Sequence, residues 1–356
     1  MDGNKLFTGT DQGIFVSTNN GNAWSPVLPV TSQKFVYSLF KNNSYLFAGI
    51  YPGNVLVSTD NGASWKSDTV GIGKKLVRTF AANSNGLFAG TWGAGIFFST
   101  DNGSSWTAVN AGIGDLYINT LMVNGNYLFA GTTDKGIYTS TDNGTTWTSL
   151  NNGLTNNYVF ALLANGSNLF AGTVGDGVFV SSNNGGSWTP VNSGLTSDSI
   201  LSFAVSGNNL FVGTQGKGVF LSTDNGADWR AINNGLTELY INSLTVNGDS
   251  LFAGTNGAGL FVTSITEITG IAKLHNEINF AIYPNPATTS INIKTSNTNP
   301  VQISLLNLLG QTVYSSSPTI SSTYSIDVAD LPKAIYIVEV KNVLTGTINR
   351  RKIVVE

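Results

Sequence analysis

The chain has 356 residues, of which 41% are hydrophobic and 11% aromatic, and its net charge is −3. Only 10% of the residues are charged, against a usual ~25%, and the chain contains 41 glycines, one histidine and no cysteine. These numbers provide apolar side chains for a folded core. They exclude disulfides and cysteine nucleophiles, disfavour histidine-based catalysis, and lack the basic footprint of nucleic-acid-binding proteins. No apolar run approaches the ~20 residues of a membrane span.

A repeat of 41 residues extends from the start of the chain to about residue 264. Six tryptophans follow one another at this interval, each closing a phrase such as STDNGASW (58–65). A second phrase, LFAGT or a close variant, occurs seven times. A period near 41 with strand-like content is typical of propeller blades of four strands each. The six tryptophans are Trp24, Trp65, Trp106, Trp147, Trp188 and Trp229.

One repeat predicts four strands. We expect an inner strand at 158–164, a second at 168–173, a third at 177–182 and an outer strand at 188–192. Asn184-Gly185 supplies the positive-φ residues of the hairpin before the outer strand. Pro190 fits an edge strand, where a missing N–H is tolerated.

Counting these strands along residues 1–263 gives six inner, seven second, seven third and six outer strands. The sequence therefore predicts an all-β, seven-bladed propeller whose first blade lacks its inner strand and whose last blade lacks its outer strand. A six-bladed ring, closed by pairing the two terminal pieces, is the alternative. Because the chain starts inside a blade and carries no signal peptide, we expect a truncated sequence.

The pattern changes after residue 264. Residues 264–279 contain no repeat phrase and are expected to form a linker. Residues 280–356 contain short alternating runs at 291–294, 301–306, 324–328, 334–340 and 348–355, separated by turn residues. About 77 residues of this kind predict a small Ig-like β-sandwich.

The phrase S-T-D-N-G-x-x-W resembles the Asp-box, or BNR repeat, of sialidases, some glycoside hydrolases, sortilin-like receptors and photosystem assembly factors. The resemblance implies a hairpin between the third and fourth strands of a blade, whose carboxylate binds turn amides and whose aromatic ring packs beneath. Two boxes carry asparagine where the others carry aspartate, which favours a structural role, since an amide oxygen also accepts these bonds. These residues are Asp60, Asp101, Asp142, Asp224, Asn19 and Asn183. Each box has at most one acid among its first five residues and no following glutamate, so we expect no metal and no cofactor.

Sialidase chemistry is disfavoured despite this resemblance. Those enzymes bind the substrate carboxylate with three arginines, and residues 1–263 contain only Arg78 and Arg230. Inverting endoglucanases with similar repeats need only two carboxylates, so a glycoside hydrolase stays open as the alternative. The candidate acids outside the boxes are Asp11, Asp68, Asp115, Asp134, Asp176, Asp198 and Glu238.

Comparison of the repeats with one another predicts where a ligand would bind. In a propeller, the loops between second and third strands share one face with the loops between blades; we call this the loop face. The residue after the nearly constant Gly-Thr differs in every repeat, which is typical of a free surface or an asymmetric site. We expect Trp92 and Tyr51 to form an aromatic platform for a sugar or peptide. The other candidates are Asp11, Arg78, Asp134, Lys135, Asp176, Gln215, Lys217, Tyr117, Tyr158 and Tyr240.

Residues 280–356 resemble the C-terminal sorting domain of the type IX secretion system of Bacteroidetes. The matching segments are YPNPATTSINI (283–293), LLNLLGQTVYS (305–315), IDVADLPKAIYIVEV (326–340) and INRRKIVVE (348–356). The resemblance implies export through the outer membrane, followed by release or attachment to the cell surface. The alternative is a generic adhesive β-sandwich.

Together these observations predict a secreted or surface-attached, monomeric β-propeller. We expect it to bind extracellular carbohydrate or protein through the loop face, without catalysis, and to contact the type IX secretion machinery through residues 280–356. Its alternatives are a glycoside hydrolase with paired carboxylates on the same face and an adhesive ectodomain without a defined pocket.

Overall fold

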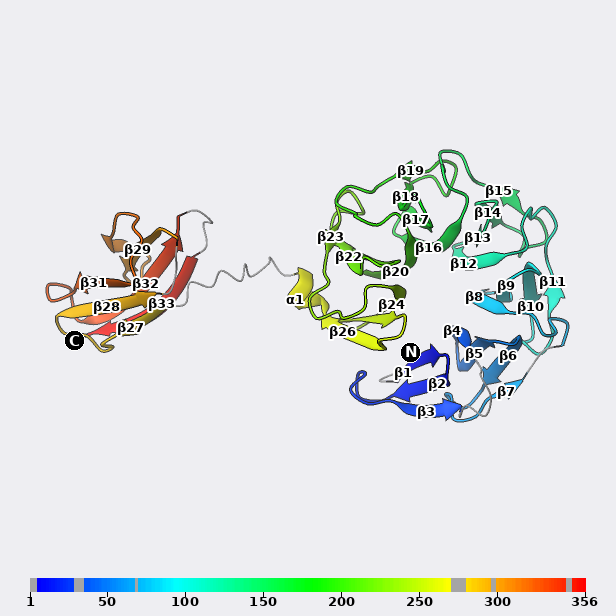
Figure 1. Ribbon diagram of the computed structural model, residues 1–356, viewed down its shortest axis with the longest axis horizontal. Coiled ribbons are helices and arrows are strands. Elements are labelled where there is room, and N and C mark those ends of the chain that lie inside the picture. The colour runs from blue at the N-terminus through cyan, green and yellow to red at the C-terminus, as the bar shows by residue number, and fades with distance from the viewer. Residues whose placement is uncertain (1–4, 29–34, 68–69, 270–279, 296–298, 344–347) are drawn as a thin grey trace. The chain divides into compact units, whose positions relative to one another are not determined.

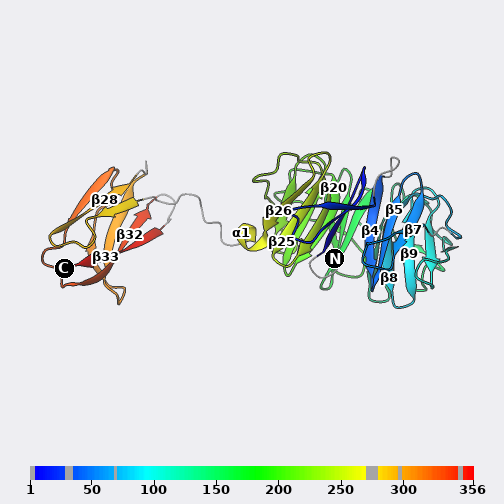
Figure 2. The ribbon, with the colours of Figure 1, turned by 90° about the horizontal axis from the view of Figure 1, so that it is seen from below.

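The computed structural model describes residues 5–28, 35–67, 70–269, 280–295, 299–343 and 348–356. The chain divides into two compact units, Met1–Thr269 and Gly270–Glu356. The described part of the first unit forms seven antiparallel sheets, which stand around a common centre (Figure 1). Seen from the side, their strands run across the thickness of the disc, so that the connections lie on its two faces (Figure 2).

Each sheet is a meander whose strands follow one another outward from the centre. The six inner strands are β4 (Val36–Asn42), β8 (Val77–Asn83), β12 (Ile118–Asn124), β16 (Val159–Asn165), β20 (Ile200–Ser206) and β24 (Ile241–Asn247). The seven second strands are β1 (Leu6–Thr10), β5 (Tyr45–Ile50), β9 (Gly86–Thr91), β13 (Tyr127–Thr132), β17 (Asn168–Thr173), β21 (Asn209–Thr214) and β25 (Ser250–Thr255).

The outer half of each sheet is shorter. The third strands are β2 (Gly13–Ser17), β6 (Asn54–Ser58), β10 (Ile96–Ser99), β14 (Ile137–Ser140), β18 (Val178–Ser181), β22 (Val219–Ser222) and β26 (Leu260–Ser264). The outer strands are β3 (Ser25–Leu28), β7 (Lys66–Ser67), β11 (Thr107–Ala108), β15 (Thr148–Ser149), β19 (Thr189–Pro190) and β23 (Arg230–Ala231). The first sheet, β1-β2-β3, and the last, β24-β25-β26, have three strands each.

The core of the first unit lies between neighbouring sheets. The LFAGT strands are buried on both faces, as their unbroken apolar sequence predicts. Phe88 of β9, for example, packs in one cluster with Ile118 and Leu121 of β12 and with Trp147. Burying each such phenylalanine stabilises the fold by about 1.5–3 kcal/mol. This burial drives neighbouring sheets to pack face to face around the ring.

The six turns that end in tryptophan (17–24, 58–65, 99–106, 140–147, 181–188 and 222–229) are called the tryptophan turns below. Each holds an asparagine and a glycine with positive φ, for example Asn61 at 56° and Gly62 at 81°. Gly62 also lies against the preceding sheet, because a Cβ atom there would be 2.6 Å from the Phe7 ring. In the same way, Gly21 of the first turn lies against Phe252 of the last sheet, at 3.2 Å from a Cβ position. The first and last sheets are therefore neighbours.

The expected linker over 264–279 differs from the structure in its first residues. Ser264 ends β26, and Ile265–Thr269 form the short helix α1 of the first unit. Ile265 is buried in the core, and the Asp249 carboxylate accepts hydrogen bonds from Ser264 and Thr266. An apolar side chain and two hydroxyl donors thus tie this segment to the last sheet. Residues 270–279 lie outside the described residues.

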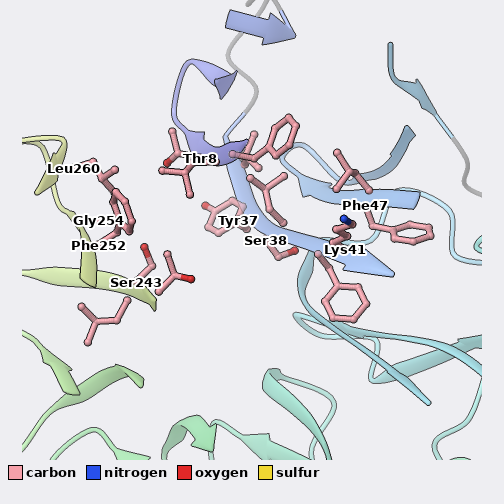
Figure 3. A pocket seen from close by; sticks show the side chains of 18 of the residues that line it. Thr8, Tyr37, Ser38, Lys41, Phe47, Ser243, Phe252, Gly254 and Leu260 are labelled. Carbon is pink, nitrogen blue, oxygen red and sulfur yellow. The ribbon is translucent and has the colours of Figure 1, made fainter. Parts of the chain in front are cut away.

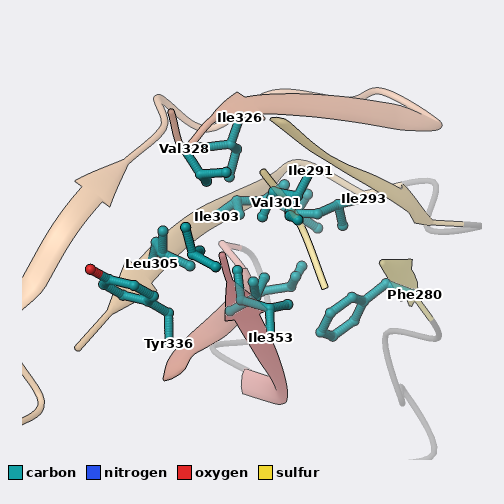
Figure 4. Packing of buried hydrophobic residues seen from close by; sticks show 14 residues of the cluster. Phe280, Ile291, Ile293, Val301, Ile303, Leu305, Ile326, Val328, Tyr336 and Ile353 are labelled. Atoms are coloured by element: carbon teal, nitrogen blue, oxygen red, sulfur yellow. The ribbon is translucent and has the colours of Figure 1, made fainter. Parts of the chain in front are cut away.

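The second unit contains two sheets with a shared apolar core (Figure 4). One sheet has the order β27-β28-β31 and the other the order β30-β29-β32-β33. Alternate residues of β29, such as Val301, Ile303 and Leu305, are buried, as period-two patterning predicts. The strands are β27 (Phe280–Tyr283), β28 (Ser290–Thr295), β29 (Val301–Leu306), β30 (Thr312–Ser315), β31 (Thr323–Asp327), β32 (Ala334–Asn342) and β33 (Ile348–Val355).

Candidate binding site on the loop face

The loop face consists of connections at one end of the strands. The turn from β9 to β10 (92–95) and the segment leading into β12 meet there, as the backbone bridge between Trp92 and Tyr117 shows. The tryptophan turns follow the other end of the third strands, because β10 runs away from residue 95 toward Ser99. Trp92 and the six repeated tryptophans therefore belong to opposite faces.

The turns of the loop face are held by repeated side-chain contacts. In the sheet of β8–β11, the Thr91 hydroxyl donates to the Gly95 carbonyl at 2.7 Å. The Asn110 amide oxygen accepts from the Ile96 N–H at 2.7 Å, and its NH₂ group donates to the Ala94 carbonyl at 3.2 Å. Asn151, Asn192 and Asn233 make the equivalent pairs of bonds in the next three sheets. These bonds fix the loop backbone, so the variable side chains stand on a rigid base.

Each inner strand has an irregularity near its start. The register shifts between its first and third residues, which is a β-bulge that leaves the second residue without a Cα partner. A bulge re-aims the side chain that it carries. The six residues at this position all lie near the loop face but differ in chemistry: Tyr37, Arg78, Asn119, Phe160, Leu201 and Asn242.

Arg78 lies at the centre of a polar and aromatic cluster built from three sheets. Its guanidinium carbon is 5.7 Å from the Trp92 ring centroid and 5.1 Å from that of Phe160, within the range of cation–π attraction. One nitrogen donates to the Asn119 amide oxygen at 3.4 Å. Asn119 is itself held by the Val159 carbonyl at 3.1 Å.

The charge of Arg78 has no carboxylate partner among the described residues. Burial lowers the pKa of its guanidinium below the usual value, and the phenols of Tyr158, Tyr37 and Tyr240 act in the opposite direction. An arginine still keeps its charge at neutral pH. A half-buried cation next to aromatic faces, with N–H donors to spare, can bind an anionic group or stack on a planar one.

Trp92 extends this cluster to the surface. Trp92 is 51% exposed, and its ring meets that of Tyr117, a residue that is 48% exposed, edge to face with centroids 5.8 Å apart. The structure thus brings together three residues that the sequence analysis proposed separately, Arg78, Trp92 and Tyr117. Such rings offer flat apolar surface on which a sugar or a side chain can lie.

Tyr51 lies in a different pair from the one expected. Its ring meets Phe35 at 6.1 Å, edge to face, and its N–H donates to the Phe35 carbonyl at 2.8 Å. Trp92 and Tyr51 are each 48% exposed or more, but they have different aromatic partners. Trp92 meets Tyr117, which precedes the inner strand of the following sheet, and Tyr51 meets Phe35, which precedes the inner strand of its own sheet. The platform predicted from Trp92 and Tyr51 is therefore two aromatic pairs.

A hollow of about 500 Å³ lies on the same face, between the sheets of β16–β19 and β20–β23. It unites the predicted residues Asp176, Gln215 and Lys217, with Asp198 beside them. The Asp176 carboxylate accepts a hydrogen bond from the Thr155 hydroxyl at 2.6 Å. Two carboxylates and one ammonium group line this hollow, which is polar enough for hydroxyl-bearing ligands.

The remaining predicted residues are spread over the face. Asp11 is exposed in the turn after β1, and Asp134 and Lys135 are exposed in the turn after β13. The backbone carbonyls of Tyr158 and Tyr240 accept hydrogen bonds from the turns of the same sheets.

Two acids of this face bind backbone amides. Asp115 accepts from the N–H groups of Tyr117 and Asp134, at 2.9 and 2.8 Å. Glu238 accepts from the Tyr240 N–H at 2.8 Å. Asp68 lies outside the described residues. Among those that are described, no group of three metal-ligating side chains occurs, and no helix is long and apolar enough to cross a membrane.

Sequence reasoning missed two residues of the cluster, Asn119 and Phe160, and it missed Tyr37, whose phenol acts on the charge of Arg78. The signal was present, because the second position of the inner strands varies from repeat to repeat just as the Trp92 position does. Arg78 attracted attention as a rare charge, whereas the others look like ordinary strand residues. Only the bulge, which aligned sequences do not display, gives this position its common direction.

Residues 281–356 match the model of the secretion system C-terminal sorting domain, and residues 87–199 match that of the DUF6242 β-propeller domain. The first unit is therefore a β-propeller, and the second is a sorting domain. A comparison with curated proteins finds no match. The sorting domain, of the type IX system, indicates secretion to the cell surface or the extracellular space.

Several solved structures share the fold. YCF48 bound to the D1 peptide superposes with a TM-score of 0.62 at 17% identity, over 75% of this chain and 90% of that one. The GH74 enzyme of Niastella koreensis gives 0.59 at 18% identity, over 98% of this chain and 64% of that one. The GH74 xyloglucanase of Xanthomonas campestris gives 0.61 at 12%, over 82% and 56%. The chain thus spans less than two thirds of both GH74 enzymes, and at these identities the likeness concerns the fold alone.

Proposed function

We propose that this secreted propeller binds extracellular carbohydrate or protein through its loop face, without catalysing a reaction. The observation that carries the proposal is the cluster of Arg78, Trp92, Tyr117 and Phe160. Its cation has no carboxylate partner among the described residues and lies against the Trp92 and Phe160 rings, and the exposed Trp92 ring in turn meets Tyr117. A structural arginine at such a site would be expected to have a carboxylate partner. A ligand that offers a flat face to Trp92 and an anionic or carbonyl oxygen to Arg78 satisfies both groups.

Comparison with known folds is compatible with this proposal. The YCF48 structure holds a peptide, and the GH74 structures are enzymes, so related rings serve both binding and catalysis. Function is carried by the site and not by the ring. We therefore base the proposal on the residues of this chain.

The test compares the purified protein with two aromatic variants on a glycan array and a peptide array. Trp92→Ala removes the exposed ring above Arg78, and we expect at least about a tenfold loss of binding to the ligands that wild type selects, or ~1.4 kcal/mol. Tyr127→Ala is the matched control, because Tyr127 is an exposed aromatic residue at the start of β13, on the opposite face. Identical profiles for Trp92→Ala and wild type would contradict the proposal.

Glycoside hydrolysis is the second candidate. It is favoured by one observation, namely that Asp176 and Asp198 line the same hollow. Paired acids about 5–10 Å apart are what such enzymes require. Release of reducing ends from a polysaccharide panel, abolished in Asp176→Asn and unchanged in Asp134→Asn, would favour this candidate over pure binding.

A further inference from the structure

The Arg78 guanidinium has N–H donors that its neighbours do not use. Its carbon lies 5.7 Å from the Trp92 ring centroid and 5.1 Å from that of Phe160, and a ring face accepts no ordinary hydrogen bond. Within the part of the chain that the structure describes, it makes one hydrogen bond, a long one of 3.4 Å to the Asn119 amide oxygen. A guanidinium carries more donors than this contact occupies.

The Asn119 side chain is fixed with its oxygen toward Arg78. Both bonds of its NH₂ group go to other residues, one to the Val159 carbonyl at 3.1 Å and one to the Thr133 hydroxyl at 3.3 Å. Asn119 is buried, so water does not compete for these positions. A neutral group thus positions the guanidinium and leaves its charge uncompensated, which prepares it for an anionic ligand without further ordering.

Phenol groups from three other sheets lie around the same charge. Tyr158, Tyr37 and Tyr240 are close enough to act on the charge of Arg78. Tyr37 stands on the bulge of β4 and points into open space toward the centre of the ring, where it lines a cavity of about 400 Å³ (Figure 3). A phenol O–H donates hydrogen bonds to anionic oxygens. An anion at Arg78 therefore finds hydroxyl donors beside the guanidinium.

The backbone around Trp92 is already paired, which decides between a peptide and a sugar. The Trp92 N–H donates to the Leu76 carbonyl at 2.9 Å, and the N–H groups of Gly93 and Gly95 donate to the Leu116 carbonyl at 3.0 and 2.9 Å. A bound peptide strand gains affinity from free main-chain groups, and these groups are occupied. A ligand at this site is read by side chains, among which the exposed Trp92 ring suits the C–H face of a sugar.

We propose that the Arg78 cluster binds a hexuronic acid unit of an extracellular polysaccharide. The sugar carboxylate accepts hydrogen bonds from Arg78, and the sugar ring packs against the exposed part of Trp92. This inference rests on the function proposed above and names the ligand class of the same site. A guanidinium binds a carboxylate through two parallel N–H groups, so the charge and the planar geometry are both recognised.

The first test changes the ligand and leaves the protein intact. Tetrasaccharides of galacturonate, mannuronate and glucuronate are each compared with the carboxyl-reduced form, in which a CH₂OH group replaces the carboxylate. Isothermal titration calorimetry at one ionic strength measures both affinities. We expect wild type to bind at least one acidic tetrasaccharide at least about tenfold more tightly than its reduced form, because hydrogen bonds to charged groups are the stronger ones. Equal affinities within every pair, or no binding of any acidic tetrasaccharide, would overturn the proposal.

The second test changes the charge of the protein. Arg78→Gln should bind the acidic and the reduced tetrasaccharide alike, and Arg78→Lys, which keeps the charge without the fork, should retain part of the preference. Lys66→Gln is the matched control, since it removes the same charge from the exposed outer strand β7. Circular dichroism checks that each variant keeps the fold. An equal loss of preference in Lys66→Gln would assign the effect to net charge and refute the role of Arg78.

Two further measurements separate this inference from the function on which it rests. If wild type binds neutral and acidic tetrasaccharides equally and Trp92→Ala binds neither, the loop face still binds carbohydrate and the hexuronic acid assignment is wrong. Tetraglutamate supplies carboxylates without a sugar ring, and we expect it to bind at least about tenfold more weakly than the preferred tetrasaccharide because it cannot cover Trp92. Equal binding of tetraglutamate would assign the site to acidic peptides instead.

Discussion

Single side chains stabilise the tryptophan turns through local hydrogen bonds. The Asp60 carboxylate accepts from the Ser58 hydroxyl and the Ser64 N–H, both at 2.8 Å. A further bond from the Ser64 hydroxyl has the largest effect, and together these bonds lower the pKa of Asp60 from 3.8 to about 2. Asn19 accepts the equivalent bond from the Ala23 N–H at 2.8 Å, so an amide performs the same task without a charge.

Acid should weaken these turns in a defined pH range. Because the pKa of Asp60 is lower in the folded chain than in the unfolded chain, its contribution to stability is complete above pH about 4 and disappears as pH falls through about 2. The pKa values of Asp101, Asp142, Asp224 and Asp249 are lowered by the same kind of bond. We expect the midpoint of thermal unfolding, followed by circular dichroism, to fall between pH 4 and pH 2.

The matched variant replaces Asp60, Asp101, Asp142 and Asp224 by asparagine, as two of the natural turns already do. Its unfolding midpoint should change less than that of wild type over the same pH range. An equal pH dependence of the two proteins would show that these carboxylates are not the titrating groups.

At the scale of elements, an asparagine side chain connects the loop-face turn to the third strand in four of the described sheets. The Asn151 amide oxygen accepts from the Ile137 N–H at 2.8 Å, and its NH₂ group donates to the Lys135 carbonyl at 2.8 Å. The bond to Ile137 satisfies a donor at the start of β14 that has no strand partner on that side. A buried N–H without a partner costs about 1–3 kcal/mol.

Asn151→Ala should therefore lower the free energy of unfolding by about 1–3 kcal/mol in urea titrations. It should also speed hydrogen exchange in the turn at 133–136, which loses its link to the sheet. Asn152→Ala is the control, since this neighbouring side chain is exposed and makes one long contact of 3.4 Å. A smaller loss for Asn151→Ala than for Asn152→Ala would refute this role.

The sequence predicted the elements well and their mutual contacts poorly. The 41-residue period, the hairpin residues and the period-two patterns follow local rules, so the second strand 168–173 was predicted with its observed bounds and the inner strand one residue early. The partner of Trp92 comes from the loop of a neighbouring sheet. Which residue of that loop contacts Trp92 depends on the β-bulges and on the angle between neighbouring sheets, and neither can be predicted from local sequence patterns. Tyr117 was accordingly predicted as an isolated residue, and Tyr51 as the partner.

At the scale of the whole molecule, the chain combines a ring with a separate sorting domain. We propose that each of the seven described sheets counts as one blade, because Gly21 and Phe252 join the last sheet to the first as Gly62 and Phe7 join the first to the second. The second unit has a core of its own, in which Ile293, Leu305 and Val338 are fully buried. The two cores share no residue, so each unit is expected to fold by itself.

Deleting residues 280–356 should abolish delivery to the surface or medium in a host with a type IX secretion system, because this segment matches the sorting domain. The remaining residues 1–279 should keep the circular dichroism and thermal midpoint of the ring. Fractionation and immunoblotting measure the location, and a deletion of the same length within the ring controls for loss by misfolding. Unchanged surface delivery without residues 280–356 would contradict the assignment.

The contact of a turn glycine with the phenylalanine of the preceding sheet has an evolutionary consequence. Four of the six turn glycines meet a phenylalanine of the preceding sheet, and the other two, Gly144 and Gly185, meet the apolar residues Val109 and Leu150. Duplication or loss of 41 residues therefore leaves an apolar junction of the same kind and alters only the curvature of the circle. A lineage could in this way change the circumference of the ring while its side chains around the central opening diversify one unit at a time.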